Sequence, residues 1–166
     1  PGYEGKVLQV EVYSKYPKVR LYLNRELVGE QATTEEQEFK ATFHVPYAPG
    51  KLKAVGVEDN KEVERTVLRS AGRASRISLH PDRRTISADG QDLSFVGIEV
   101  NDKDGTLQPN AQNRMQFSIS GPGAIVGVGN ADTKDVDQYV GTMRRAWHGR
   151  ALVVIRSTKR AGSINL

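Results

Sequence analysis

Cysteine is absent from this 166-residue sequence, which excludes disulfide bridges and thiolate metal sites within it. The three histidines, His44, His80 and His148, are too scattered along the chain to suggest a metal centre, so we expect no metal and no cofactor. No apolar run approaches the roughly 20 residues that a membrane-spanning helix needs. We therefore expect no insertion into a membrane.

The sequence also lacks the motifs of common catalytic sites. It has no G-x-S-x-G element and no cysteine nucleophile. Its carboxylates are adjacent, as in Glu35 and Glu36, or lie on expected loops. None forms a recognisable pair that could face across a cleft roughly 5–10 Å wide, as a glycosidase requires. We predict that this chain on its own is inactive and contains no catalytic residue.

Two glycine-containing motifs are better interpreted as turns than as ligand-binding loops. Pro122 lies among the glycines of residues 121–129 and the β-like segment 124–128 follows it, whereas a phosphate loop runs into a helix whose N-terminus holds the anion. Residues 102–105 (DKDG) lack the third acidic position and the distal glutamate of a calcium loop. Neither motif therefore indicates a ligand.

A strong charge of one sign is also missing, since the formal net charge is only +4. Residues 1–72 contain 11 basic and 11 acidic side chains, and residues 73–166 contain 13 and 9, which accounts for the whole surplus. A nucleic-acid-binding surface needs a clustered basic face, but these arginines are scattered over several expected strands. We expect a solvated surface and no nucleic-acid partner.

What the sequence does contain is a repeated alternation of apolar and polar residues. It is clearest in residues 39–58, where the period of two is typical of a half-buried strand. The residues expected to face the core are Phe39, Ala41, Phe43 and Val45. Residues 46–50 contain two prolines and a glycine, which end the strand because proline has no N–H for the ladder. Alternation then resumes at Leu52.

The same pattern recurs along the chain and predicts many short strands. The expected strands are Val7–Tyr13, Lys18–Asn24, an edge strand from Glu62 to Arg69, Ile77–Leu79, Ile86–Ala88, Leu93–Asn101, Met115–Ile119, Ala124–Val128 and a central strand Ala151–Arg156. Residues Ser163–Leu166 either close the second domain or are cut within its closing strand. Helical periodicity is missing, although the polar loop 129–141 could hold one helical turn. The sequence therefore predicts an all-β fold of two tandem immunoglobulin-like antiparallel β-sandwich domains.

A short stretch of small residues, Ser70–Ala74, separates two halves with the same pattern. We expect it to be a linker, with one sandwich in residues 1–72 and the other in residues 73–166.

One surface could contact a glycan. Trp147 follows a polar loop, and aromatic faces stack on sugars while amide, carboxylate and guanidinium groups bond the hydroxyls. The candidate contact residues are Trp147, Tyr139, Asn130, Asp132 and Arg145. The alternative is that Trp147 is a core residue beneath the long loop, as is common for a lone tryptophan in a sandwich.

Several segments carry a family resemblance. They are Val10–Tyr13, Val19–Asn24, Val45–Gly56, Ile77–Arg83, Ile86–Val96, Val100–Gly105, Phe117–Gly123 and Ala161–Gly162. Together they resemble the C-terminal accessory region of bacterial glycoside hydrolase family 2 enzymes, the β-galactosidase-like ones common in gut Bacteroidetes. The second half is also similar to bacterial immunoglobulin-like, invasin-type repeats. The chain departs from the family at Arg25, where glycine is usual, and arginine is a poor fit for the positive φ of a type I′ turn.

The resemblance implies a non-catalytic accessory fragment that supports or borders the catalytic barrel of the same parent chain. The two catalytic glutamates of the family sit in a (β/α)₈ barrel, which needs about 250 residues and alternating helices. No family catalytic residue can therefore be carried onto this sequence. The alternatives are a carbohydrate-binding module, which would bind oligo- or polysaccharide, and an adhesin-type cell-surface spacer.

The resemblance also implies a periplasmic or extracellular location. The N-terminal residues PGYEGK contain no signal peptide, since they lack a basic start followed by an apolar segment. Pro1 and Gly2 are typical of an interior cut, so we expect that such a segment could have been removed.

Overall fold

The computed structural model describes residues 3–166, in which the regular structure is all strand except for one short 3-10 helix. The chain divides into two units, one ending at Ser70 and the other beginning at Ala71. Each unit contains antiparallel sheets, which confirms the predicted all-β, immunoglobulin-like fold class. The expected cut at Pro1 and Gly2 lies outside the described residues, and the domain boundary at residue 72 stays a prediction.

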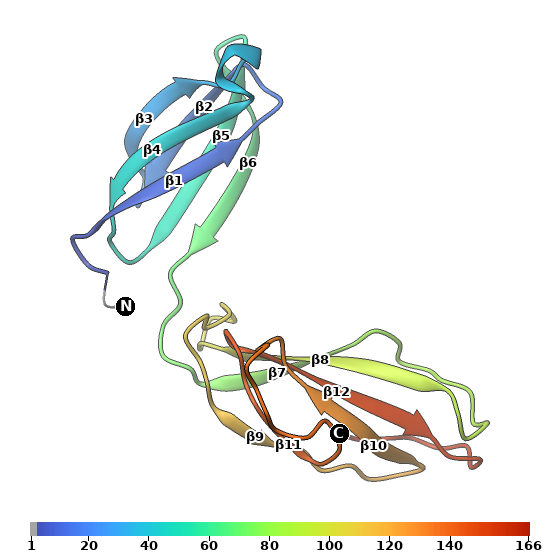
Figure 1. Cartoon of the computed structure of the whole chain (residues 1–166). Coiled ribbons are helices and arrows are strands. Elements are labelled where there is room, and N and C mark those ends of the chain that lie inside the picture. The colour runs from blue at the N-terminus through green and yellow to red at the C-terminus, as the bar shows by residue number, and fades with distance from the viewer. Residues whose placement is uncertain (1–2) are drawn as a thin grey trace. The chain divides into compact units, whose positions relative to one another are not determined.

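The first unit consists of a four-stranded and a two-stranded sheet (Figure 1). Its elements are β1 (Val7–Tyr13), β2 (Lys18–Leu23), β3 (Glu26–Ala32), η1 (Glu35–Gln37), β4 (Lys40–Pro46), β5 (Lys51–Glu58) and β6 (Lys61–Arg69). The larger sheet has the order β3-β2-β5-β6, so β6 is an edge strand as predicted, and β1 pairs with β4. The consecutive strands β4 and β5 lie in different sheets.

Alternating residues from both sheets of the first unit form one core. Leu21 on β2, Phe43 on β4 and Ala54 on β5 belong to the same buried cluster, with Leu21 fully buried. Burial of a large apolar side chain of this kind contributes about 1.5–3 kcal/mol. The prediction that Phe39 faces this core is wrong, since its side chain is 51% exposed. Phe39 has a φ of 57° just after η1 and precedes β4, whose buried positions begin at Ala41.

The turn between β2 and β3 shows how the departure at Arg25 is accommodated. Asn24 and Arg25 have φ of 51° and 79°, the backbone signs of a type I′ turn, so arginine adopts the conformation that its identity disfavours. The Asn24 side chain donates to the Pro49 carbonyl (3.0 Å) and accepts from the Lys51 amide (2.8 Å). These bonds fasten the turn to the β4–β5 connection and hold Arg25 in place.

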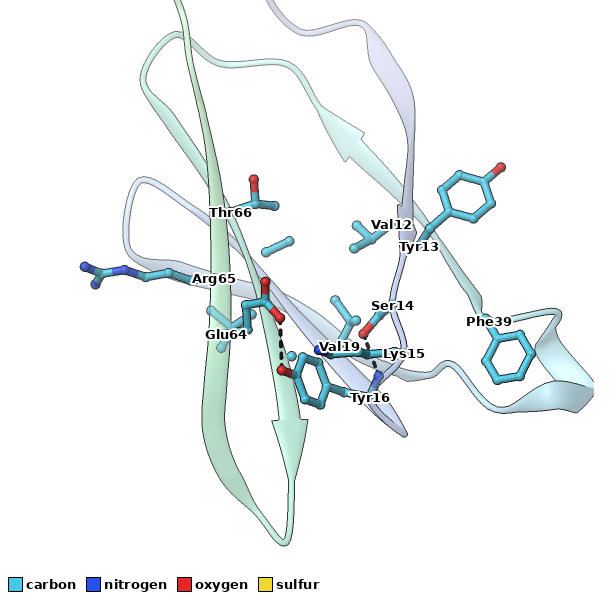
Figure 2. Close-up of a pocket in the computed structure, with 13 residues that line it drawn as sticks. Val12, Tyr13, Ser14, Lys15, Tyr16, Val19, Phe39, Glu64, Arg65 and Thr66 are labelled. Atoms are coloured by element: carbon cyan, nitrogen blue, oxygen red, sulfur yellow. Dashed lines mark hydrogen bonds between the residues drawn. The ribbon is translucent and has the colours of Figure 1, made fainter.

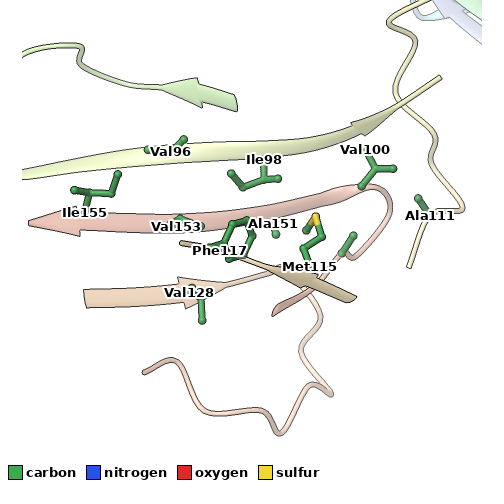
Figure 3. Close-up of a cluster of buried hydrophobic side chains, with 11 residues drawn as sticks. Val96, Ile98, Val100, Ala111, Met115, Phe117, Val128, Ala151, Val153 and Ile155 are labelled. Carbon is green, nitrogen blue, oxygen red and sulfur yellow. The ribbon is translucent and has the colours of Figure 1, made fainter. Parts of the chain in front are cut away.

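The second unit also combines a four-stranded and a two-stranded sheet. Its strands are β7 (Arg76–Pro81), β8 (Leu93–Asn101), β9 (Arg114–Gln116), β10 (Gly123–Gly129), β11 (Met143–Arg145) and β12 (Arg150–Ser157). The larger sheet has the order β10-β12-β8-β7, so β12 is central as predicted, and β9 pairs with β11. Figure 3 shows the core, in which alternate residues of β8 and β12, such as Ile98 and Val153, pack with Met115 and Phe117.

Four sequence-based expectations fail wholly or in part in the second unit. The strand predicted for Met115–Ile119 is β9, which covers only Arg114–Gln116. Ile86–Ala88 is not a strand, because nearby carboxylates bind the backbone instead of a neighbouring strand: Asp92 accepts from the Ser87 amide at 2.7 Å. Residues 163–166 form only an isolated bridge, between Asn165 and Ser120. The loop that follows β10 contains a turn and bends but no helical turn.

Candidate contact surface on the β10–β11 loop

The buried side chain of Arg144 holds the β10–β11 loop (residues 130–142) in place through hydrogen bonds. It lies on β11 and its side chain is only 1% exposed. Its Nη1 donates to Asp135 Oδ2 at 2.8 Å, and its Nη2 donates to the carbonyls of Val128 (2.9 Å) and Gln138 (3.0 Å). Its Nε is buried without a partner. Charge-assisted bonds of this kind are the stronger ones in proteins, so the guanidinium fixes an irregular loop to the end of β10.

The loop also closes the free edge of β10. The Val128 amide donates to the Tyr139 carbonyl at 2.8 Å, while the Val128 carbonyl accepts from Arg144. The guanidinium carbon of Arg144 lies 5.1 Å from the centroid of the Tyr139 ring, within the range of a cation–π contact. Tyr139 is thus held by both its backbone and its ring, although its side chain is 69% exposed.

Asp135 is the anionic partner of this arrangement. Its Oδ1 accepts from the Asp137 amide (2.9 Å), and its Oδ2 accepts from Asn130 Nδ2 (2.7 Å) and from Arg144. The hydrogen bond from the Asp137 amide, and then the bond from Arg144, hold the pKa of the Asp135 carboxyl below its ordinary value. The group is ionised at neutral pH and is occupied by structural bonds, so it is unsuited to donate a proton in catalysis.

The structure brings together four of the five predicted contact residues. Asn130 donates to the Arg145 carbonyl at 2.9 Å and accepts from the Asp132 amide, and Tyr139 completes the group through Arg144. The side chains of Asn130 and Asp132 form bonds inside the loop, since Asp132 Oδ1 accepts from the Lys134 amide. Much of their hydrogen-bonding capacity is therefore already used.

Trp147 lies apart from this group, in the turn between β11 and β12. Its ring is half-buried and meets His148 edge-on with centroids 4.6 Å apart, and its backbone bridges Arg150. Within residues 3–166, no hydrogen bond or ring contact joins Trp147 to the other four predicted residues.

The residue that sequence reasoning missed is Arg144. The sequence analysis named its neighbour Arg145 instead, and a buried arginine is not expected because arginine is mostly exposed in proteins. The structure places Arg144 opposite the buried Met115 on the neighbouring strand, in an inward-facing position.

The first unit contains a groove that the sequence did not indicate (Figure 2). It has a volume of about 550 Å³ and lies beside the end of β1 and the middle of β6. The Tyr16 hydroxyl donates to Glu64 Oε2 at 2.9 Å, and its backbone carbonyl accepts from the buried Thr33 hydroxyl at 2.6 Å. The ring lies on Gly56, where a Cβ atom would come within 2.3 Å of it. Tyr16 is therefore held in one orientation.

The groove does not have the acid pair of a glycosidase. Glu64 is the only carboxylate among its lining residues, whereas both types of glycosidase use two facing carboxyl groups. Among residues 3–166, no group of three or more histidine, cysteine, aspartate or glutamate side chains could hold a metal ion. The groove therefore lacks the pair of facing carboxyl groups that glycosidases of the usual type need.

Comparison with known proteins identifies the family. Residues 77–166 match the family described as Glycoside hydrolase family 2 C-terminal domain 5, which covers more than half of the chain. The chain belongs to this family. Residues 5–64 of this family 2 accessory chain match a domain of unknown function, DUF4982. The predicted resemblance is thus confirmed.

The relatives of this family 2 accessory chain are much longer enzymes. The β-galactosidase BoGH2A of Bacteroides ovatus is 32% identical over 93% of the chain, which corresponds to 18% of that protein. A β-galactosidase of Thermoanaerobacter pseudethanolicus is 29% identical over 93% of the chain, or 21% of that protein. A solved family 2 glycosyl hydrolase from Bacteroides cellulosilyticus is 42% identical, with a TM-score of 0.94 over 99% of the chain and 23% of its own.

The chain therefore spans about a fifth of the length of the relatives it matches. It corresponds to a C-terminal accessory part of family 2 glycoside hydrolases, as the sequence segments predicted.

Proposed function

We propose that this chain serves a β-galactosidase-like enzyme as a non-catalytic accessory region that supports or borders the catalytic barrel. The main support for this proposal is that the similarity to two β-galactosidases extends over 93% of the chain and includes both units in tandem. The groove beside β6 supports this role, because Glu64 is the only carboxylate among its lining residues. The proposed partner is the catalytic barrel of the same parent chain.

The test compares the 166-residue chain with its parent enzyme on aryl-β-galactosides. We expect hydrolysis by the parent, none by the chain, and a loss of activity or thermal stability when residues 1–166 are deleted from the parent. Hydrolysis by the isolated chain would contradict the accessory role. A parent with no glycosidase activity on any aryl glycoside would contradict the enzyme class.

We also propose that the protein acts in the periplasm or outside the cell, as its family resemblance implies. Among residues 3–166, no helix is long and apolar enough to span a bilayer. Fractionation of the producing cells should recover the parent enzyme outside the cytoplasm, and recovery from the cytoplasm alone would contradict this location.

A second candidate function is contact with a glycan through Trp147, Tyr139, Asn130, Asp132 and Arg145. The exposed ring of Tyr139 favours it, because a fixed aromatic face can stack on a sugar. Titration with galactans should then give saturable binding that Trp147→Ala and Tyr139→Ala weaken. Absence of binding to any oligosaccharide on a glycan array, with an unchanged fold, would remove this function.

A further inference from the structure

The tip of the β10–β11 loop exposes an unusual amount of apolar side chain. Val136, Tyr139 and Val140 are 95%, 69% and 78% exposed, and Met143 at the start of β11 is 44% exposed. Four of the eight residues from Val136 to Met143 are thus large, apolar and in contact with water. Single exposed apolar residues are common, but a group of them marks an interaction surface.

This apolar group is displayed on a rigid support. Arg144 and Asp135 form a buried ion pair beneath it, with side chains 1% and 14% exposed. The ion pair and the bonds from Arg144 to the carbonyls of Val128 and Gln138 hold the loop in one arrangement. A preorganised surface loses little conformational freedom on binding, which favours association.

We propose that the β10–β11 loop is the surface through which this chain docks onto an apolar face of the remaining polypeptide of the parent enzyme. The inference rests on the proposed function, since it names the contact surface of the accessory region. The occupant follows from length: four-fifths of each relative lies outside the matched part, so most of the parent enzyme is available as a partner.

The chemistry of the tip favours protein over glycan as the occupant. Glycans need polar groups that are free to bond hydroxyls, but Asn130, Asp132 and Asp135 direct bonds into the loop itself. The two most exposed apolar side chains of the tip, Val136 and Val140, are aliphatic and offer no hydrogen bond to a sugar, although Asp137 and Gln138 beside them are also exposed. An apolar protein surface that packs against these two side chains would remove them from water, which is favourable.

The absence of native cysteine in this chain gives a direct test. Val136→Cys places a single thiol at the most exposed position of the tip, and Ala88→Cys is a matched control on an exposed loop of the same unit. Maleimide labelling of the cysteine-containing peptide is followed by mass spectrometry in the 166-residue chain and in the parent enzyme. We expect Val136→Cys to react at least about tenfold more slowly in the parent, with Ala88→Cys within about twofold.

Several outcomes would overturn the docking surface. They are equal reactivity of Val136→Cys in the chain and the parent, equal protection of both cysteines, and protection of the isolated chain by a galactan, which would assign the tip to a glycan. Activity of the parent on aryl glycosides is measured alongside. An active parent with an accessible Val136→Cys rejects the surface but not the proposed function.

A second variant tests the same contact through its effect on the melting temperature. Val136→Asp places a charge on an exposed side chain, so the melting temperature of the isolated chain should stay unchanged. In the parent the charge would be buried against an apolar face, and we expect a lower melting temperature there. An unchanged parent would contradict the docking surface.

Discussion

At the residue scale, the position of Tyr16 depends on a glycine in a neighbouring strand. Its ring occupies the space that a side chain of Gly56 would fill, with a virtual Cβ atom only 2.3 Å from Tyr16 Cδ2. Gly56 lies in the interior of β5, where glycine is otherwise unfavourable. Its role is therefore close packing of an aromatic ring rather than flexibility.

Gly56→Ala should lower the free energy of unfolding by about 1–3 kcal/mol, because the added methyl group forces the Tyr16 ring out of its rotamer. Urea denaturation followed by tyrosine fluorescence measures the loss. Gly29→Ala on β3 is the matched control, since its Cβ atom would meet Phe43 at an ordinary 3.5 Å. Equal losses in the two variants would show that the Tyr16 contact is not the cause.

At the element scale, the β10–β11 loop is ordered by ionised side chains instead of by strand pairing. The lowered pKa of Asp135 means that the unfolded chain binds a proton more readily than the folded one in acid. The stability that Asp135 contributes is therefore complete above the ordinary carboxyl pKa of 3.8 and is lost as the pH falls through the lower folded-state value.

Asp135→Asn should flatten part of the decline in stability between neutral pH and strong acid. The measurement is the melting temperature of the second unit at a series of pH values below 5. Asp137→Asn is the control, because its carboxylate makes no hydrogen bond or ion pair within the described residues, and we expect it to keep the unmodified profile. An identical acid profile for Asp135→Asn would show that the loop is not held by this carboxylate.

Strands were predictable to the extent that hydrophobic alternation decides them. The expected bounds of β8, Leu93–Asn101, agree with the structure, in which Val96, Ile98 and Val100 alternate on its buried face. The strand predicted at Ile86–Ala88 does not form, because the nearby carboxylates of Asp82, Asp89 and Asp92 accept hydrogen bonds from backbone amides. The sequence pattern does not show in which direction a carboxylate points. The candidate site was predicted only in part. The polar loop could be recognised in the sequence, but the burial of the Arg144 side chain could not.

At the scale of the whole molecule, both units share a sandwich of four strands on two. In the first unit both edge strands of the larger sheet, β3 and β6, are mostly exposed, and in the second unit the edge strand β7 is. One groove lies beside β6 and another beside β7, with volumes of about 550 and 290 Å³. The two cores contain different residues, around Leu21 in one and Ile98 in the other.

Separate cores predict separate unfolding of the two units. Leu21→Ala and Ile98→Ala should each cost about 2–5 kcal/mol, because each removes a side chain that is at most 1% exposed. Differential scanning calorimetry should show two transitions, with each variant lowering one of them. A single transition that both variants lower equally would contradict the prediction and show that the units unfold together.

The bond between the Val128 amide and the Tyr139 carbonyl has a consequence for behaviour at high concentration. The segment Gly123–Gly129 contains no charge, and a bare strand of this kind is a template for aggregation. On β6, charged side chains discourage such growth, whereas β10 depends on the loop that covers it. We therefore expect loss of the Arg144 anchor to uncover the β10 edge at Val128 and to increase aggregation at high concentration.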